Sequence, residues 1–147
     1  MANTKWEVVG MRPTKEKMSK FDLDLKYGQI REDKIAEMFT DKKIEVKSER
    51  GMWMKTGNIC IEYQSYGKPS GIATTEADYW FHNLCIGDDI FCTLIFDVPK
   101  LKKLIEKLDF KKSVSGGDHN ASRMWLVNIR KLFTSDVYKT FEDLKDE

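Results

Sequence analysis

The sequence predicts a mixed α/β or α+β fold in which helices flank a central sheet, and three observations predict it. Residues 43–47 and 57–64 each alternate apolar and polar side chains, which is the period of half-buried strands. Residues 90–96 are a continuous apolar run with one threonine, typical of a strand covered on both faces. Apolar residues with helical spacing lie between these segments, as in layered domains that mix both kinds of element.

Length and composition predict one folded domain over residues 1–147. A chain of 147 residues with 41% hydrophobic residues is large enough to bury a core. The 25 Lys and Arg residues nearly balance the 24 Asp and Glu residues, so the net charge is only +1. No global attraction to nucleic acid follows, and any DNA binding must use local basic patches.

Apolar runs and cysteine usage predict a cytoplasmic protein without a membrane partner. No run is long enough for a membrane span, and residues 1–6 lack the hydrophobic core of a signal peptide. Cys60, Cys85 and Cys92 show no CxxC spacing and lie in apolar contexts, so we expect buried thiols in a reducing compartment. With only His82 and His119 to supplement them, a structural zinc site is not expected.

The first forty residues predict a strand and then a helix. Apolar residues alternate with polar ones from Phe21 to Tyr27, and Gly28 ends this pattern. Residues 29–39 have helical spacing, with Glu32 on or beside the face that should meet the sheet. The stripe of this helix is Glu32, Ile35, Ala36 and Phe39.

The middle of the chain predicts a second helix after the two strands. Residues 50–56, which include Trp53, fit a hairpin loop or a short extra strand, and residues 65–71 have the composition of a turn. Thr74 or Thr75 can cap a helix. Its apolar stripe is Ala77, Trp80, Phe81 and Leu84.

The last third predicts a helix after the apolar strand, a loop, a strand and a final helix. Asp97 is a suitable N-cap with Pro99 in the first turn. A loop at 115–120, a strand at 123–129 and a helix at 135–144 follow. The predicted buried stripe of the helix after Asp97 is Leu101, Leu104, Ile105 and Leu108.

The polar faces of the two alternating strands carry the chemistry. In the first strand Glu45 and Lys47 share a face, and in the second Glu62 and Gln64 do so together with Cys60. If the strands are neighbours, two carboxylates, a lysine and an amide gather on one side of the sheet. Carboxylate oxygens are the ligands that Mg²⁺ and Mn²⁺ prefer, so this face is a plausible site for metal-assisted phosphodiester hydrolysis.

Three longer runs carry a resemblance to a known family. They read KTGNICIEYQS (55–65), GKPSGIATTEADYW (67–80) and GGDHNAS (116–122). With the order of helix and strands, over roughly residues 21–130, the chain resembles the PD-(D/E)XK nuclease superfamily, in particular small phage-encoded endonuclease-like proteins. The resemblance implies a restriction-endonuclease-like sheet flanked by helices. It further implies a Mg²⁺- or Mn²⁺-dependent DNA endonuclease in the host cytoplasm, with DNA as partner and a homodimer as a possible state.

In the family pattern, one strand carries an acidic residue. The next strand carries Asp or Glu, then any residue, and then Lys. The resemblance makes Glu45 the first acid and the run 62–64 the second element, with Lys47 as a substitute lysine because Gln64 occupies the usual position. Glu45 and Glu62 would hold the metal, and Glu32 would join them directly or through water. Lys47 or Gln64 would orient the attacking water or the phosphate.

Two alternatives stay open. One makes Asp41 the first acid and the run 45–47 the second element, but Asp41 is so close to Glu45 that a two-strand clamp is harder to build. The other follows from Gln64, which departs from the family pattern: a nuclease-fold protein that binds DNA or a protein partner without cutting. A phage structural or host-takeover protein that retains the fold is a third, weaker reading.

Further residues are candidates for DNA contacts, each with an ordinary structural explanation. Lys68 lies in a glycine-rich turn, and Trp53 could stack on an unpaired base. Arg123 could contact the DNA backbone as part of a basic patch with Lys111, Lys112, Arg130 and Lys131. Ordinary structural roles account for these residues about as well, because the lysine and arginine can be solvated on the surface and the tryptophan can be buried. Asp78 and His82 are spaced to pair on a helix, and His119 lies in a run better explained as a turn than as an HNH nuclease motif.

Overall fold

The computed structural model describes residues 20–134 and residue 137, and the chain divides into two compact units, Met1–Lys42 and Lys43–Glu147. The prediction of a single domain over 1–147 stays a prediction. The final helix expected at 135–144 lies outside the described residues, apart from Val137. Among the described residues, no helix combines the length and apolar character needed to cross a membrane.

The described part of the first unit contains one helix, α1, at Lys20–Glu37. The early strand predicted from Phe21 to Tyr27 is therefore wrong, and the helix predicted at 29–39 is the second half of α1. Helical hydrogen bonds form within the segment, whereas a strand would need a partner strand to pair with. Glu32 lies on α1 and is half-buried.

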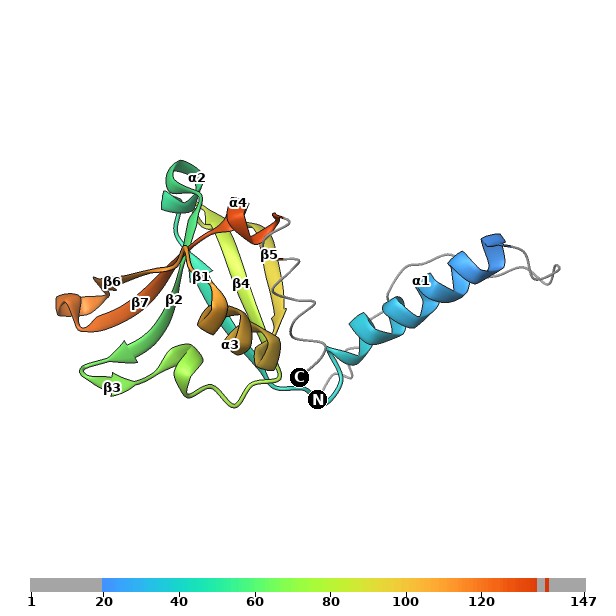
Figure 1. Cartoon of the computed structure of the whole chain (residues 1–147), viewed down its shortest axis with the longest axis horizontal. Helices are drawn as coiled ribbons and strands as arrows, with labels where there is room; N and C mark the ends of the chain where they lie inside the picture. Colours follow the sequence, from blue (N-terminus) through green and yellow to red (C-terminus); the bar gives the residue numbers. More distant parts are fainter. Residues whose placement is uncertain (1–19, 135–136, 138–147) are drawn as a thin grey trace. The chain divides into compact units, whose positions relative to one another are not determined.

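The described part of the second unit contains two sheets (Figure 1). The first sheet has the order β1-β4-β5, with β1 parallel to β4 and β4 antiparallel to β5. The second sheet is antiparallel and has the order β3-β2-β7-β6. The strands are β1 (Ile44–Glu49), β2 (Asn58–Ser65), β3 (Lys68–Pro69), β4 (Tyr79–Ile86), β5 (Asp89–Asp97), β6 (Lys112–Gly116) and β7 (Ser122–Asn128).

Short helices connect the strands, and the mixed α+β class is confirmed. The expectation of one central sheet is wrong, because the strands divide between two sheets. The described helices of this unit are α2 (Met52–Thr56), α3 (Val98–Lys107) and α4 (Ile129–Leu132), with 3₁₀ turns η1 (Gly71–Ala73) and η2 (Asp118–Asn120).

The strands β1 and β2 are both confirmed, but they are not neighbours. Their chain order suggested a hairpin, yet β1 pairs with β4 and β2 pairs with β7 and β3. The intervening residues form α2, neither the hairpin loop nor the extra strand expected there. Trp53 of α2 is half-buried, donates from Nε1 to the Cys85 carbonyl oxygen (2.8 Å) and stacks on Phe91, in agreement with its structural reading.

The helix predicted after Thr75 is wrong, because this segment forms β4. The strand is central in its sheet and buried on both faces, so its apolar residues do not alternate with polar ones. Trp80 and Leu84 share a face with the spacing of a strand, while Phe81 points to the opposite face. The i, i+3, i+4, i+7 spacing that favoured a helix was a coincidence of this doubly buried sequence.

The apolar run at 90–96 forms a strand, β5, as predicted, but the prediction that both faces of this strand are covered is wrong. β5 lies at the edge of its sheet, and Phe91 and Ile95 are 65% and 41% exposed. Across the sheet Ile95 pairs with Phe81, which pairs with Val46, so a partly exposed apolar row crosses this outer face.

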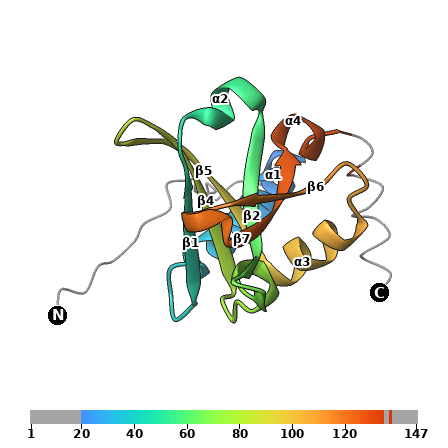
Figure 2. The ribbon, with the colours of Figure 1, turned by 90° about the vertical axis from the view of Figure 1, so that its left-hand side faces the viewer.

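The core contains residues of both sheets and of α3. Figures 1 and 2 show these elements from two sides. The helix predicted after Asp97 is confirmed, with Pro99 in its first turn and Asp97 Oδ1 accepting from the Lys100 backbone N–H (3.0 Å). The predicted stripe is buried. It packs with residues of both sheets, among them Ile59, Ile61, Trp80, Leu84 and Val127.

Candidate functional site

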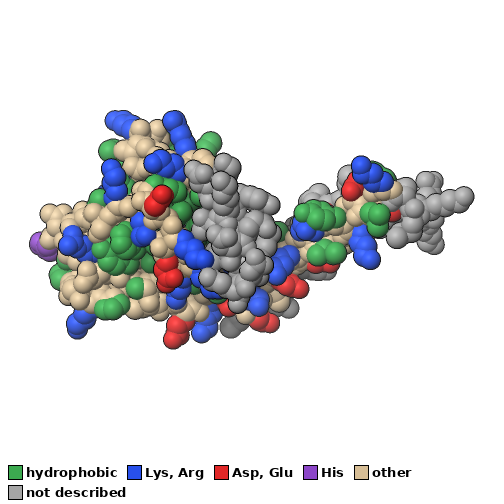
Figure 3. Space-filling view, viewed as in Figure 1, with side chains coloured by type: hydrophobic (Ala, Val, Ile, Leu, Met, Phe, Trp, Pro, Cys, Tyr) green, Lys and Arg blue, Asp and Glu red, His purple; other side chains and the backbone are tan. Residues whose placement is uncertain are grey.

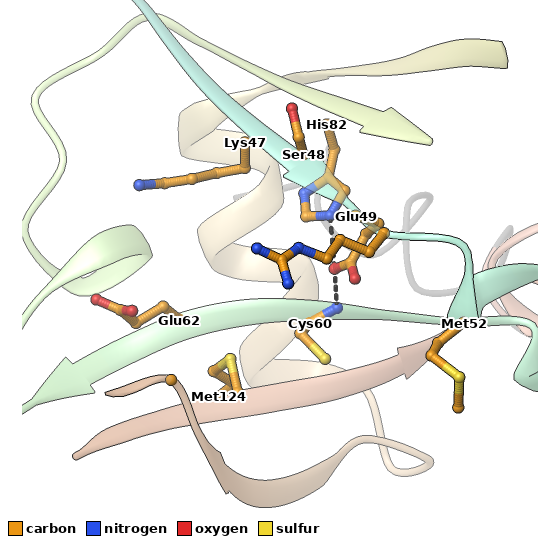
Figure 4. Close-up of a pocket in the computed structure, with 10 residues that line it drawn as sticks. Lys47, Ser48, Glu49, Met52, Cys60, Glu62, His82 and Met124 are labelled. Atoms are coloured by element: carbon orange, nitrogen blue, oxygen red, sulfur yellow. Dashed lines mark hydrogen bonds and ion pairs between the residues drawn. The ribbon is translucent and has the colours of Figure 1, made fainter. Parts of the chain in front are cut away.

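A cleft of about 500 Å³ lies between the two sheets. Its walls come from β1 and β4 on one side and from β2 and β7 on the other (Figure 4). We call this site the cleft. Its lining includes Lys47, Glu49, Cys60, Glu62, His82 and Met124.

Lys47 and Glu62 approach the same end of the cleft from different sheets (Figure 4). The Lys47 ammonium nitrogen lies 2.9 Å from Glu45 Oε1 and 5.8 Å from the centre of the Trp80 ring. Both members of the Lys47–Glu45 pair are about one-third to two-fifths exposed. The pair holds an extended, charged lysine at this end of the cleft.

The Glu62 carboxylate is held by two hydroxyl groups. Ser70 Oγ donates to Oε1 (2.7 Å) and Ser122 Oγ donates to Oε2 (3.1 Å). Gly71 makes the first contact possible, because its φ is +53° and a Cβ there would lie 2.2 Å from the Glu62 carbonyl oxygen. Each carboxylate oxygen keeps a second lone pair, so Glu62 is oriented without being saturated.

A hydrogen-bonded chain holds Glu49 in the wall of the cleft. His82 is 1% exposed, and its Nδ1 accepts from Trp80 Nε1–H (3.0 Å). An indole nitrogen can only donate, so His82 carries its proton on Nε2 and donates to Glu49 Oε1 (2.9 Å). The backbone N–H of Cys60 donates to the same oxygen.

Cys60 has a thiol whose pKa is changed by its surroundings. Burial raises the pKa of its thiol to about 11, and the neighbouring Glu49 carboxylate adds to the rise. Both effects disfavour the thiolate, so this side chain has the chemistry of a neutral thiol. The three cysteines are free, as expected, although each is half-buried instead of fully buried.

Of the other predicted site residues, Glu45 and Gln64 do not line the cleft. Glu32 belongs to the first unit. A β-bulge at Tyr63 brings Gln64 into register with Arg123, and Gln64 does not line the cleft. Asp41, the alternative first acid, lies before β1 with a φ of +53°.

The residues considered for DNA contacts have no shared site. Lys68 is exposed on β3, and Arg123 is exposed on β7 with Nη1 donating to Ser115 Oγ (3.2 Å). The Asp78–His82 pair is wrong, because both residues lie in or beside a strand. Asp78 Oδ2 instead accepts from the Lys43 backbone N–H (2.9 Å).

The donor set of the cleft suits a weakly held hard cation. Within residues 20–134 and 137, no group of three or more His, Cys, Asp or Glu side chains is placed to hold a metal ion. Of the predicted carboxylates, Glu62 lines the cleft, whereas Glu45 pairs with Lys47 and is not part of the lining. Mg²⁺ is commonly held by one or two carboxylates together with water and substrate phosphate, so these residues fit an ion that binds with its substrate.

Sequence reasoning missed Glu49, Ser70 and Ser122. Glu49 has a sequence signal, because it continues the alternation of Glu45 and Lys47 by one more step along β1. The two serines come from residues 8 and 60 positions after Glu62, and no local pattern connects them.

Comparison with family models, with curated proteins and with solved structures found no match to this chain.

Proposed function

We propose that this protein is a metal-dependent nuclease that hydrolyses phosphodiester bonds of DNA in the cleft. One observation carries the proposal: the Lys47 ammonium and the Glu62 carboxylate reach the same end of one open cleft from different sheets. A cation for the phosphate and a carboxylate for a metal are the side-chain types that this reaction needs. The resemblance of three sequence runs to PD-(D/E)XK nucleases supports the same chemistry.

Glu62 would hold Mg²⁺ or Mn²⁺, and Glu45, which pairs with Lys47 outside the lining of the cleft, would be the second carboxylate. When bound, such an ion neutralises phosphate charge and lowers the pKa of water. Ser70 and Ser122 orient the Glu62 carboxylate, as hydrogen-bonded neighbours of metal-ligating carboxylates generally do. Lys47 binds the phosphate and offsets the negative charge that develops on it. We assign the lysine role of the family pattern to Lys47, since Gln64 does not line the cleft.

A second candidate is a nuclease-fold protein that binds DNA without cutting it. The small donor set favours it, because the described residues offer no three-ligand metal cluster. Calorimetric titration separates the two candidates. A nuclease should bind Mn²⁺ in the presence of a non-cleavable oligonucleotide, and the binding protein should not.

The decisive experiment compares the wild-type protein with Glu62→Gln in cleavage of single-stranded and duplex DNA with Mg²⁺ or Mn²⁺. The amide is isosteric but supplies no anionic oxygen, so we expect cleavage to decrease about a hundredfold or more, at least as much as for loss of an outer-shell partner. Far-UV circular dichroism should show an unchanged fold.

Glu106→Gln is the matched control, because Glu106 is an exposed carboxylate on α3 away from the cleft. It should cleave at the wild-type rate. Equal cleavage by Glu62→Gln and wild type would refute the assignment of the site.

A further inference from the structure

We propose that the part of the cleft around Glu49 binds the base of one unpaired nucleotide and prefers a base with an exocyclic amino group. The substrate would then be single-stranded DNA, or a single-stranded part of a branched DNA, and not a continuous duplex. This inference deepens the proposed function and rests on it for the position of the phosphate near Lys47.

The size of the cleft limits what can enter. A volume of about 500 Å³ lies within the range of ~300–1,000 Å³ that holds one small-molecule ligand. One nucleotide is a ligand of that size. A base inside a duplex is stacked and paired, so it must leave the helix to reach such a pocket. An unpaired nucleotide enters without that cost.

Glu49 presents a rigid acceptor to this space. Its Oε1 receives two hydrogen bonds, from the Cys60 N–H and from His82 Nε2–H, whereas Oε2 accepts no hydrogen bond from the described residues. No buried side-chain nitrogen or oxygen of the described residues lacks a partner, so Oε2 remains open to the cleft that Glu49 lines. The two bonds to Oε1 hold the carboxylate in this orientation.

An ionised carboxylate only accepts hydrogen bonds, and this determines which base it favours. Cytosine, adenine and guanine each carry an exocyclic amino group that can donate to Oε2, whereas thymine has none and presents a carbonyl oxygen where cytosine has its amino group. Other residues that line the cleft can contact the base and the phosphate of the same nucleotide. Met52 and Met124 offer thioethers for contact with the base, and Arg50 adds a second cation beside Lys47 for phosphate.

The test measures binding, not cleavage, so that it is independent of catalysis. Fluorescence anisotropy in the presence of EDTA compares labelled oligo(dC), oligo(dT) and a blunt duplex of equal length. We expect the wild-type protein to bind oligo(dC) about tenfold more tightly than oligo(dT), as one charge-assisted hydrogen bond allows. The duplex should bind more weakly than oligo(dC).

Glu49→Gln tests the role of the open oxygen. The amide oxygen can still accept from the Cys60 N–H and from His82 Nε2–H, which turns the NH₂ group toward the cleft as a donor. The preference for oligo(dC) over oligo(dT) should disappear or reverse, while Glu106→Gln should keep it.

Three results would overturn the inference: equal binding of oligo(dC) and oligo(dT) by the wild-type protein, a preference that Glu49→Gln leaves unchanged, or a duplex that binds as tightly as oligo(dC). The wild-type comparison stands even if Glu49→Gln does not fold. A failure of the proposed function appears separately, as unchanged cleavage in Glu62→Gln, and leaves the anisotropy result intact.

Discussion

Cys60 illustrates how one residue takes its chemistry from its neighbours. Its backbone N–H donates to Glu49, while its thiol is half-buried and lies in the field of the same carboxylate. Burial first, and the negative charge second, raise the pKa of the thiol to about 11. The residue therefore lines the cleft as a neutral group and is a poor candidate for nucleophilic catalysis.

The raised pKa of Cys60 predicts a loss of stability at alkaline pH. In the unfolded chain the thiol ionises near 9.0, whereas in the folded protein it ionises near 11, so the unfolded state binds fewer protons between these values. The free energy of unfolding should therefore decrease as the pH rises from 9.0 to about 11. Urea unfolding at a series of pH values measures it.

Cys60→Ala should show a smaller decrease over this pH window, because the titrating group is gone. Cys85→Ala is the matched control and should keep the wild-type decrease. The same pH dependence in Cys60→Ala and Cys85→Ala would contradict the assignment to Cys60.

At the scale of the element, sequence patterns succeeded where one face of an element is buried. β2 and α3 each have such a face, so the period of their apolar residues equals the period of the structure. β1 alternates as predicted, but its apolar Val46 lies on the exposed face, and Glu45 and Lys47 lie on the more buried one. β4 is buried on both faces and loses that period, so its sequence predicts a helix although the segment forms a strand. The first half of α1 has the alternation of a strand but forms a helix, because alternation alone does not provide a partner strand.

The α3 cap is a local device with a measurable effect. Asp97 lies in extended conformation before the helix, and its Oδ1 accepts from the free Lys100 N–H of the first turn. Asp97→Ala should lower the free energy of unfolding by about 1 kcal/mol, the usual effect of removing an N-cap. Chemical denaturation measures it.

Glu106→Ala on the same helix is the control, and it should change the free energy of unfolding by less than about 0.5 kcal/mol, since Glu106 is exposed. A loss of equal size in both variants would show that the cap does not stabilise α3.

At the scale of the whole molecule, charge is spread out and nearly balanced. Lys and Arg side chains are scattered over the second unit, not gathered in one patch, on the face that Figure 3 shows. With a net charge of +1, long-range attraction to DNA is weak. Binding of nucleic acid must then depend on a few cations near the cleft, Lys47 and Arg50 among them.

Few phosphate contacts predict a shallow salt dependence of DNA binding. Each phosphate contact to a single strand contributes about 0.7 to the slope of log K against log salt concentration. Lys47→Ala should therefore reduce the slope by about 0.7 and weaken oligo(dC) and oligo(dT) alike. Anisotropy titrations at several salt concentrations measure the slope. Lys100→Ala, an exposed lysine on α3, should not alter it, and equal effects of the two variants would argue against a phosphate at Lys47.

Part of the candidate site could be read from the chain and part could not. The shared face of Glu45 and Lys47 follows from strand periodicity, and one more step along the strand reaches Glu49. The partners of Glu62 could not be foreseen, because Ser70 and Ser122 reach it through a glycine turn and a distant strand. The bulge that separates Gln64 from the Glu62 face also leaves no trace in the sequence.

Local periodicity and capping residues were sufficient to define α3, several strands and the mixed α+β class, because these depend on neighbours within a few positions. They were not sufficient to define which strands pair, because hydrogen bonds between strands join residues far apart in the chain. Alternative pairings of the same strands have nearly the same local pattern. The tertiary arrangement separated β1 and β2 into two sheets and yet placed Lys47, Glu49 and Glu62 around one cleft. Burial of the apolar faces against α3 holds the two sheets around that core.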